Sequence, residues 1–269
     1  MSPMDFNSLE LPEPVMRGIR DAGFVAATPI QESTLPLALK GKDVAGQSQT
    51  GTGKTAVFLI AAFTRCLRHP APAKSGPTAP RVLIIAPTRE LVVQIEADAR
   101  LLGAHTGLKI RAVYGGIDYN KQREDLGEAC DILVGTPGRL IDYLKQHIWS
   151  PQRVEVLVID EADRMFDMGF IDDVREIVRA IPRHRQTLLF SATMAPRIKH
   201  LAEQIQTDPV VIEVGEQRNP IESVTQHVYP TQSDRKLGLL KTILEDEHMD
   251  RVLVFTCTKD GADFVVKRL

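Results

Sequence analysis

The chain has 269 residues, of which 43% are hydrophobic and 25% are charged, and its formal net charge is -2. This composition is ordinary for a folded globular protein and excludes a disordered chain, while the near-balanced charge excludes attraction to nucleic acid through bulk charge alone. No apolar run approaches the roughly 20 residues of a membrane-spanning helix and the first residues lack a signal-peptide pattern, so we expect a cytoplasmic protein with no membrane partner.

Short apolar runs alternate with amphipathic stretches along the first 214 residues. Several runs are apolar on both faces, as buried parallel strands are. The predicted strands are 43–45, 82–86, 109–114, 131–134, 156–160, 187–191 and 210–214. The predicted helices are 30–39, 54–67, 89–102, 138–146, 172–180 and 198–206. This alternation predicts an α/β fold in which helices flank a mostly parallel sheet.

A polar, turn-rich stretch follows the last of these strands and predicts a domain boundary. We expect a first domain at 1–214, a linker at 215–222 and the truncated start of a second domain at 223–269. The second unit should hold strands at 223–229 and 252–255 and helices at 236–245 and 259–269. So little sheet cannot bury both of its faces, which is why we expect this unit to be incomplete.

The three cysteines, Cys66, Cys130 and Cys257, are far apart and odd in number. They fit neither a zinc site nor a disulfide framework. We expect buried, reduced thiols.

A glycine-rich loop stands between the first predicted strand and the helix that follows it. Its sequence is Ser48-Gln49-Thr50-Gly51-Thr52-Gly53-Lys54-Thr55. Glycines let the backbone approach a triphosphate closely, and the start of the helix faces the anion. We expect Lys54 to reach the β- and γ-phosphates of a nucleotide and the Thr55 hydroxyl to bind Mg²⁺. The alternative is an ordinary glycine-rich turn, which the setting between strand and helix disfavours.

Acidic residues stand at the end of the apolar strand predicted at 156–160. Because ligands bind at the carboxyl ends of parallel strands, Asp160 and Glu161 should lie close to the bound nucleotide. We expect Asp160 to hold Mg²⁺ and Glu161 to act as the catalytic residue that orients and activates the attacking water. Taken alone, the same residues could be a solvated strand end.

Residues 160–163 read Asp-Glu-Ala-Asp, and this block resembles the signature of the DEAD-box family of RNA-dependent ATPases. Further blocks in the family's order cover residues 6 to 258. The resemblance implies a RecA-like P-loop domain followed by an incomplete second RecA-like domain. It also implies ATP and Mg²⁺ as cofactors and the activity of an ATP-dependent RNA helicase, which separates short duplexes locally.

The block 23–31 resembles the family's adenine-binding block. By this resemblance, Gln31 hydrogen-bonds the adenine edge, Phe24 stacks on the ring and Thr28 belongs to the same ATP site. An amide side chain can donate and accept at once, as adenine requires. The family usually has Pro where this chain has Ala27, a departure that leaves Thr28 and Gln31 intact.

Three blocks resemble the family's contacts with the RNA backbone, and each follows a predicted strand. Backbone N–H groups, hydroxyls and an arginine suit phosphate oxygens and carry no base information, so RNA should bind without strong sequence preference. The residues implied in RNA binding are Pro87, Thr88, Arg89, Gly115, Gly116, Thr136, Gly138 and Arg139.

The block Ser191-Ala192-Thr193 matches the family's block that couples hydrolysis to strand separation. The resemblance implies that its two hydroxyls bond Asp163 and so connect the nucleotide site to the domain interface. Taken alone, Ser and Thr after a strand are common turn formers.

The block 252–259 resembles the first block of the family's second domain, whose later arginine-rich blocks are missing from this sequence. Those arginines would act on the γ-phosphate, where such residues are worth about 10³ to 10⁵ in rate. We therefore expect this chain to bind ATP and to hydrolyse it poorly. Segments 44–47 and 138–146 are similar to the bacterial RhlB-like subgroup, which would imply an RNA-decay assembly as a partner.

Two other functions stay open at this point. Another P-loop enzyme, such as a GTPase or a transporter ATPase, would share the glycine-rich loop, although the sequence contains neither an Asn-Lys-x-Asp guanine-binding motif nor a transporter signature. A non-catalytic module that recruits RNA or another protein would share the fold.

Overall fold

A computed structural model gives the structure of residues 4–49, 51–70, 78–214, 225, 227–245 and 251–269. The chain forms two compact units, Met1–Gly215 and Glu216–Leu269. The first unit contains every residue that the sequence predicts to take part in binding or catalysis.

The described part of the first unit contains one sheet of seven strands, and every neighbouring pair is parallel. The strands are β1 (Val44–Gln47), β2 (Val82–Ile85), β3 (Ile110–Val113), β4 (Ile132–Gly135), β5 (Val156–Ile159), β6 (Gln186–Ser191) and β7 (Val210–Glu213). Their order across the sheet is β3-β4-β2-β5-β6-β1-β7. The predicted α/β fold with a parallel sheet is confirmed.

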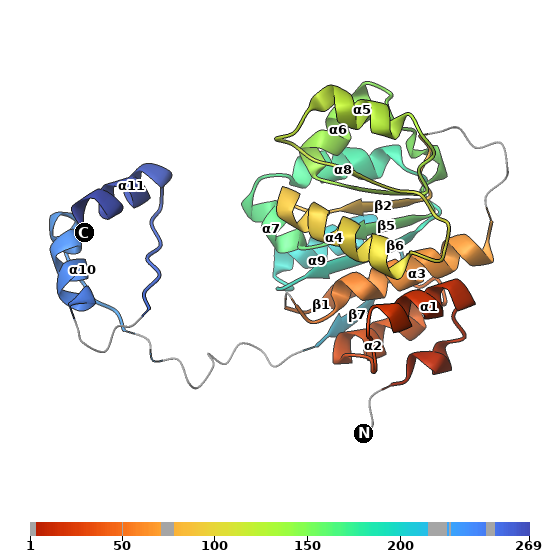
Figure 1. Cartoon of the computed structure of the whole chain (residues 1–269), viewed down its shortest axis with the longest axis horizontal. Helices are drawn as coiled ribbons and strands as arrows, with labels where there is room; N and C mark the ends of the chain where they lie inside the picture. The colour runs from red at the N-terminus through yellow and green to blue at the C-terminus, as the bar shows by residue number, and fades with distance from the viewer. Residues whose placement is uncertain (1–3, 50, 71–77, 215–224, 226, 246–250) are drawn as a thin grey trace. The chain divides into compact units, whose positions relative to one another are not determined.

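Helices cover both faces of this sheet (Figure 1). One apolar core lies under α1 (Glu13–Asp21), α2 (Pro29–Ala38), α3 (Lys54–Arg68) and α4 (Arg89–Leu102). The other lies under α5 (Tyr119–Leu126), α6 (Pro137–Lys145), α7 (Ala162–Asp167), α8 (Ile171–Ala180) and α9 (Pro196–Ile205).

Strand β2 shows why the sheet strands are continuous apolar runs. Val82 and Ile84 belong to the first core, and Leu83 and Ile85 belong to the second. Successive side chains of a strand point to opposite faces, and both faces are covered here, so no position of β2 can be polar without cost.

Three helices of the first unit were not predicted. Helix α1 buries Val15, Met16 and Ile19 at helical spacing, which is a signal that could have revealed it. Helix α5 is polar almost throughout and buries only Gln122 and Leu126, so its apolar pattern is too weak to read. Helix α7 has six residues, fewer than a periodic pattern needs.

The second unit differs from what the sequence predicts. It contains the short 3-10 helix Ser233–Arg235, α10 (Lys236–Leu244) and α11 (Lys259–Arg268), which match the two predicted helices. The strand predicted at 252–255 is wrong, because these residues are exposed and outside regular structure. An apolar run becomes a strand only where a neighbouring strand accepts its backbone hydrogen bonds, and the described residues of this unit offer none.

The structure also tests two smaller predictions, and each of them is wrong in part. Part of the strand predicted at 223–229 lies outside the described residues, and residues 225 and 227–229 form no strand. Cys66 and Cys130 are buried as expected, whereas Cys257 is exposed, so the prediction of a buried thiol is wrong there. Within the described ranges, no helix combines the length and the hydropathy that a membrane span requires.

Candidate functional site

The predicted site residues gather at one edge of the sheet. The glycine-rich loop follows β1, and Asp160 and Glu161 follow β5. The three blocks predicted to bind RNA follow β2, β3 and β4, and Ser191 ends β6. Because all the strands are parallel, their carboxyl ends share this edge, which is where ligands bind in open α/β sheets.

The glycine-rich loop is closed around the side chain of Lys54. Lys54 is 5% exposed, and its ammonium group donates to the carbonyl oxygen of Ser48 at 2.6 Å. The hydroxyls of Ser48 and Thr52 lie 2.5 Å apart, and Thr52 also donates to the carbonyl oxygen of Gln49 at 2.8 Å. Gly53 has φ 94°, in the left-handed region where a side chain would be strained. Thr50 lies outside the described residues.

The predicted adenine-binding residues are attached to this loop from α2. Thr28 donates from its hydroxyl to the carbonyl oxygen of Thr52 at 2.8 Å, and the Gln31 amide donates to the carbonyl oxygen of Gly53 at 3.1 Å. The Gln31 side-chain oxygen accepts from the backbone N–H of Thr28 at 2.9 Å. Gln31 is 3% exposed, and both the oxygen and the nitrogen of its side-chain amide form hydrogen bonds within the protein.

A cavity of about 510 Å³ lies beside the glycine-rich loop, and Thr28 and Gln31 are not among its described lining residues. Lys54, Thr55, Asp160 and Glu161 line one part of it, and the ring of Phe24 lines another. Phe24 is partly exposed and its ring centroid lies 6.2 Å from that of the buried Phe6. The cavity is large enough for a nucleotide, since ligand pockets usually measure roughly 300–1,000 Å³.

Helix α4 forms a wall of this cavity that the sequence did not predict. Gln94, Asp98 and Leu101 line the cavity at helical spacing, and all three are exposed. Partial burial raises the pKa of the Asp98 carboxyl above its usual range. Leu91, Ala97 and Leu102 line the same cavity, so the face of α4 that meets it combines apolar and polar side chains.

Asp160 is the most buried acid of the site, at 2% exposure. Burial raises the pKa of its carboxyl to about 6, although the positive charge of Lys54 acts in the opposite direction. Its Oδ1 accepts from the backbone N–H of Glu161 at 2.9 Å. A cation placed beside this carboxylate would offset the cost of burying its charge.

Glu161 has φ 54° and ψ 51°, in the left-handed region that residues other than glycine seldom adopt. Such conformations carry a cost of about 1–3 kcal/mol and concentrate at functional sites. The turn at Glu161 separates β5 from α7 and leaves its side chain lining the cavity.

The described residues contain no cluster of three or more His, Cys, Asp or Glu side chains that could hold a metal by themselves. A Mg²⁺ ion bound together with a nucleotide usually takes one or two carboxylates, the phosphates and water. Thr55 and Asp160 line the same cavity and supply oxygen atoms of the required kind.

The residues predicted to couple the site to other parts of the protein do meet. Thr193 donates from its hydroxyl to Asp163 Oδ2 at 3.4 Å, and the backbone N–H of Asp163 donates to Ser191 Oγ at 3.2 Å. The end of β6 is therefore joined to the first turn of α7, directly after Glu161.

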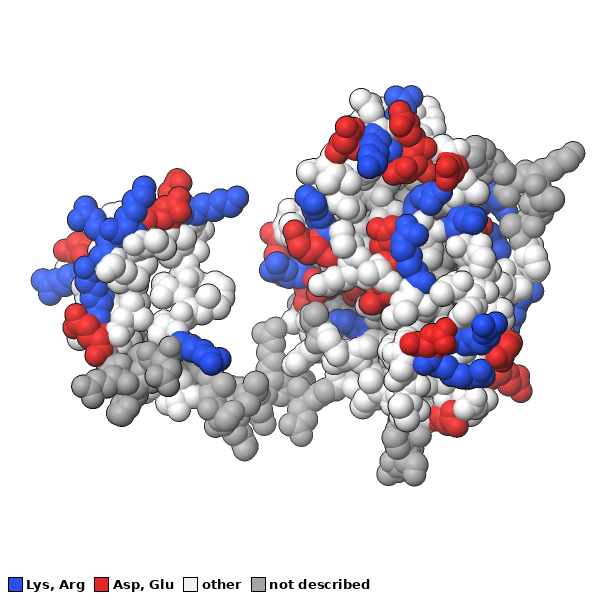
Figure 2. Space-filling view, viewed as in Figure 1, with Lys and Arg blue, Asp and Glu red and all other residues white. Residues whose placement is uncertain are grey.

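Two of the blocks predicted to bind RNA lie against each other. Arg89 donates to the carbonyl oxygen of Gly116 at 3.4 Å, and its guanidinium lies 5.3 Å from the ring centroid of Tyr114. Thr88 caps α4 by accepting from the backbone N–H of Leu91 at 3.2 Å. Pro87 is buried, whereas Arg89 and Gly115 are exposed. Positive and negative side chains are interspersed on the face of the first unit that Figure 2 shows. Binding of RNA to this face would therefore depend on individual side chains such as Arg89, and not on a broad positive surface.

Arg139 has a different setting. Its guanidinium lies 4.9 Å from the ring centroid of Tyr119 and 5.3 Å from that of Tyr143, and it donates to the Tyr143 hydroxyl at 3.1 Å. Thr136 is the N-cap residue of α6, and Gly138 lies in its first turn. The structure therefore gives Arg139 a packing role between its own helix α6 and α5, and only the contact with Tyr119 could not be read from the spacing of the sequence.

Comparisons with known proteins point to one family. The family model described as "DEAD/DEAH box helicase" matches residues 28–201. The chain is 46% identical over 272 residues to the ATP-dependent RNA helicase RhlB of Xanthomonas oryzae pv. oryzae, a match that covers 100% of this chain and 47% of that protein. It is 43% identical over 265 residues to RhlB of Shewanella denitrificans, covering 98% of this chain and 61% of the relative. The chain thus spans about half the length of the Xanthomonas relative.

Proposed function

The chain belongs to the DEAD/DEAH box helicase family, and from that premise we propose that it is the ATP-binding part of an ATP-dependent RNA helicase. The observation that carries the proposal is the single cavity shared by Lys54, Thr55, Asp160, Glu161 and Phe24. It places groups suited to phosphate, metal and a flat ring in one space, as an adenine nucleotide requires.

The triphosphate would lie over the start of α3. The loop is already closed around Lys54, so binding would exchange the bond to the Ser48 carbonyl oxygen for bonds to phosphate oxygens. Thr55 and Asp160 would hold Mg²⁺, directly or through water, and the ion would neutralise charge on the phosphates. Phe24 would stack on the base. Gln31 would give up one of its hydrogen bonds within the protein and form one to the edge of the adenine ring.

Hydrolysis would depend on Glu161. Its carboxylate lines the cavity next to Asp160, where it can accept a hydrogen bond from a water molecule and orient it toward the γ-phosphate. The resemblance to the family implies that arginines of the second domain complete this site. The 269 residues contain no match to those blocks, so slow turnover is the expected result for this chain by itself.

RNA would bind along the same edge of the sheet through Arg89, Thr88, Gly115 and Gly116. These groups suit the sugar-phosphate backbone and leave the bases unread. Asp163, bonded to Ser191 and Thr193, would transmit the state of the nucleotide site to the rest of the protein.

The test is competition between ATP and GTP for the chain, followed by ATP turnover with and without single-stranded RNA. We expect ATP to bind, GTP to compete poorly, and turnover to be slow and insensitive to RNA. The helicase assignment would be abandoned if GTP bound more tightly and Gln31→Ala changed nothing. Fast, RNA-stimulated turnover would instead show that another residue or a second copy of the chain supplies the positive charge.

An RNA-decay assembly is the partner that the similarity to RhlB-like helicases suggests. This second proposal rests on that similarity alone. Copurification of the chain with a ribonuclease from a bacterial lysate, lost after nuclease treatment, would attribute the association to RNA and count against a direct protein contact.

A further inference from the structure

The guanidinium of Arg89 lies over the aromatic ring of Tyr114, 5.3 Å from the ring centroid. The two residues come from different elements, since Arg89 begins α4 and Tyr114 directly follows β3. Arg89 also donates to the carbonyl oxygen of Gly116 at 3.4 Å. A Cβ atom on Gly116 would lie 3.4 Å from Nη1 of Arg89, so the glycine leaves room beside the guanidinium. Arg89 is therefore held by a ring and a backbone carbonyl while it stays exposed.

Tyr114 is itself held in place by the side chain of Gln122 on α5. The amide oxygen of Gln122 accepts from the backbone N–H of Tyr114 at 2.8 Å, and the amide nitrogen donates to the carbonyl oxygen of Tyr114 at 3.0 Å. Gln122 is 4% exposed, and Tyr114 packs against the first apolar core. Both polar groups of the Tyr114 backbone are thus bonded, so its ring offers Arg89 a fixed support.

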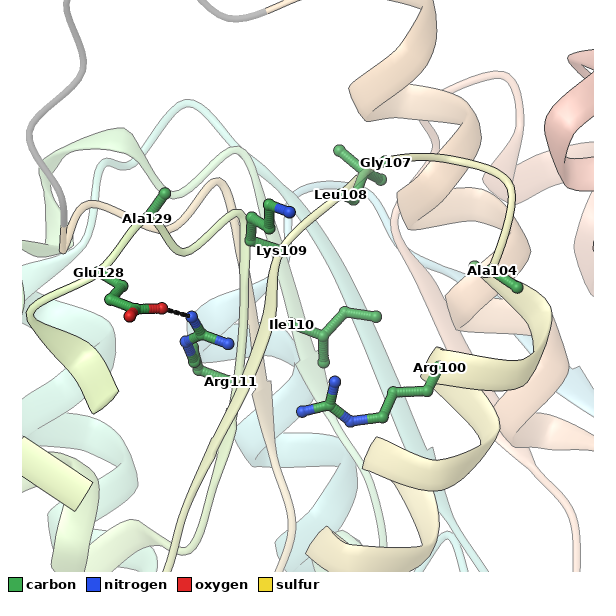
Figure 3. A pocket seen from close by; sticks show the side chains of 10 residues that line it. Arg100, Ala104, Gly107, Leu108, Lys109, Ile110, Arg111, Glu128 and Ala129 are labelled. Carbon is green, nitrogen blue, oxygen red and sulfur yellow. Dashed lines mark hydrogen bonds and ion pairs between the residues drawn. The ribbon is translucent and has the colours of Figure 1, made fainter. Parts of the chain in front are cut away.

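The positive charge of Arg89 stays available, unlike that of two other arginines on the same elements. Arg100, in the last turn of α4, pairs with Glu96 at 2.6 Å. Figure 3 shows Arg111 of β3 joined to Glu128, with Arg100 in the wall of the same cavity. Among the described residues, Arg89 has no carboxylate partner. A ring and a carbonyl oxygen carry no net charge, so they orient a guanidinium without neutralising it.

A phosphate of the RNA backbone is the group that such an oriented charge suits. Arg89 lies in the first turn of α4, next to the N-cap residue Thr88, and the start of a helix favours an anion. Arginine binds phosphate through two parallel N–H donors, which requires a defined orientation of the guanidinium plane. An unsupported arginine would have to be ordered on binding, and ordering a long side chain weakens the affinity.

We propose that Tyr114 is a positioning residue for RNA binding. Its ring holds the Arg89 guanidinium in the orientation that meets a backbone phosphate, and Gln122 holds Tyr114 in turn. Tyr114 acts on the RNA only through Arg89. This inference rests on the proposed function, because it takes Arg89 as a phosphate contact.

The first test measures the affinity of the chain for a labelled single-stranded oligouridylate by fluorescence anisotropy. Tyr114→Leu keeps apolar packing and removes the ring, and it should weaken binding by about threefold to tenfold, because Arg89 must then be ordered on binding. Tyr114→Phe keeps the ring and should bind like the unaltered chain. In the Arg89→Ala background, Tyr114→Leu should have no further effect, whereas a general structural role of Tyr114 would weaken binding in both backgrounds.

The second test needs no RNA. In a proton–nitrogen correlation spectrum, the side-chain Nε–H signal of Arg89 is assigned by its loss in Arg89→Ala, and its position responds to the ring current of Tyr114. Tyr114→Leu should move this signal, and Tyr114→Phe should leave it close to its original position. Phe264→Leu is the matched control, because it removes a ring 5.7 Å from Arg268 in the second unit. It should change neither the Arg89 signal nor the RNA affinity.

The inference alone is overturned if Arg89→Ala weakens RNA binding and Tyr114→Leu does not, or if Tyr114→Leu weakens it equally in both backgrounds. An Arg89 signal that stays in place when the ring is removed would overturn it as well. Equal RNA binding by the unaltered chain and Arg89→Ala would instead remove Arg89 from the proposed RNA site, and the inference would fall with it.

Discussion

The side-chain amide of Gln31 donates to the carbonyl oxygen of Gly53 at 3.1 Å, so the residue predicted to contact the base is attached to the loop predicted to contact the phosphates. A Cβ atom on Gly53 would lie 2.5 Å from Gln31 Nε2, which shows how closely the two segments approach. The two segments predicted to contact the base and the phosphates are therefore joined by a hydrogen bond within the protein.

Gln31→Ala should weaken both folding and ATP binding. It leaves the N–H of Thr28 without its side-chain acceptor, and such a loss costs about 1–3 kcal/mol of the free energy of unfolding. Urea denaturation and ATP titration of the same variant measure the two effects. Gln146→Ala removes an exposed amide that bonds Asp142 and is the control. Lost ATP affinity with unchanged stability would show that Gln31 contacts only the nucleotide.

Lys54→Ala should remove most of the ATP affinity, at least about tenfold, because the charge directed at the phosphates is lost. Among the described residues, the ammonium group of Lys54 donates to the Ser48 carbonyl oxygen, and the fold should tolerate the loss of that bond. Titration with a fluorescent ATP analogue measures the affinity, and Lys121→Ala on exposed α5 is the control. Unchanged affinity would count heavily against the glycine-rich loop as the phosphate site.

Glu161→Gln should keep ATP binding and lower the rate of hydrolysis by about 10² or more, the usual contribution of a general base. Gln can adopt the same backbone conformation and preserves the shape of the side chain. Single-turnover hydrolysis with protein in excess over ATP detects even slow chemistry. Glu203→Gln, on the exposed surface of α9, should match the unaltered chain. Near-normal hydrolysis by Glu161→Gln would remove Glu161 from the catalytic role.

Asp160 should make the fold less stable as the pH rises from about 4 to about 6. Its pKa in the folded chain is raised from 3.8 to about 6, so the folded state retains a proton that the unfolded state has already released. This difference in pKa between the folded and the unfolded chain corresponds to a loss of about 3 kcal/mol of the free energy of unfolding once the pH exceeds 6. Asp160→Asn removes this cost, and its stability gain over the unaltered chain should grow between pH 5 and 6 and then level off.

Urea denaturation across that pH range checks the prediction. Asp125→Asn, on the exposed side of α5, should give a difference that does not change between pH 5 and 6. A pH-independent gain for Asp160→Asn would mean that the buried carboxyl keeps its ordinary pKa.

Arg89 and Arg139 should behave differently, although both stand in blocks that resemble RNA contacts. Arg89→Ala should weaken RNA binding and reduce the salt dependence of the affinity by about one phosphate contact. Arg139→Ala should mainly lower stability, by about 1–2 kcal/mol, because it removes contacts with two tyrosine rings and a hydrogen bond. RNA affinity at several salt concentrations, with thermal unfolding, separates the two roles. If Arg139→Ala lowered the RNA affinity as much as Arg89→Ala, Arg139 would have to be assigned to the RNA site as well.

The sequence by itself determined the layout of the first unit. Runs such as Val82–Ile85 are apolar on both faces, and only a sheet covered on both sides buries such strands fully. Parallel strands then bring every loop after a strand to one edge, which places the glycine-rich loop and Asp160 at the same end of the sheet without any knowledge of contacts. The pattern of apolar residues along the chain was sufficient to predict this layout, because the pattern follows from the local geometry of strands and helices.

Tertiary structure alone decided which side chains meet. Arg139 of α6 lies against Tyr119 of α5, and Gln31 of α2 is held to Gly53 at the start of α3, because separate segments of the chain pack together. The run 252–255 shows the converse, since this apolar run forms no strand and the described residues of the second unit offer it no neighbouring strand. Contacts between residues far apart in the chain depend on packing, and the period of a local pattern carries no information about the partner.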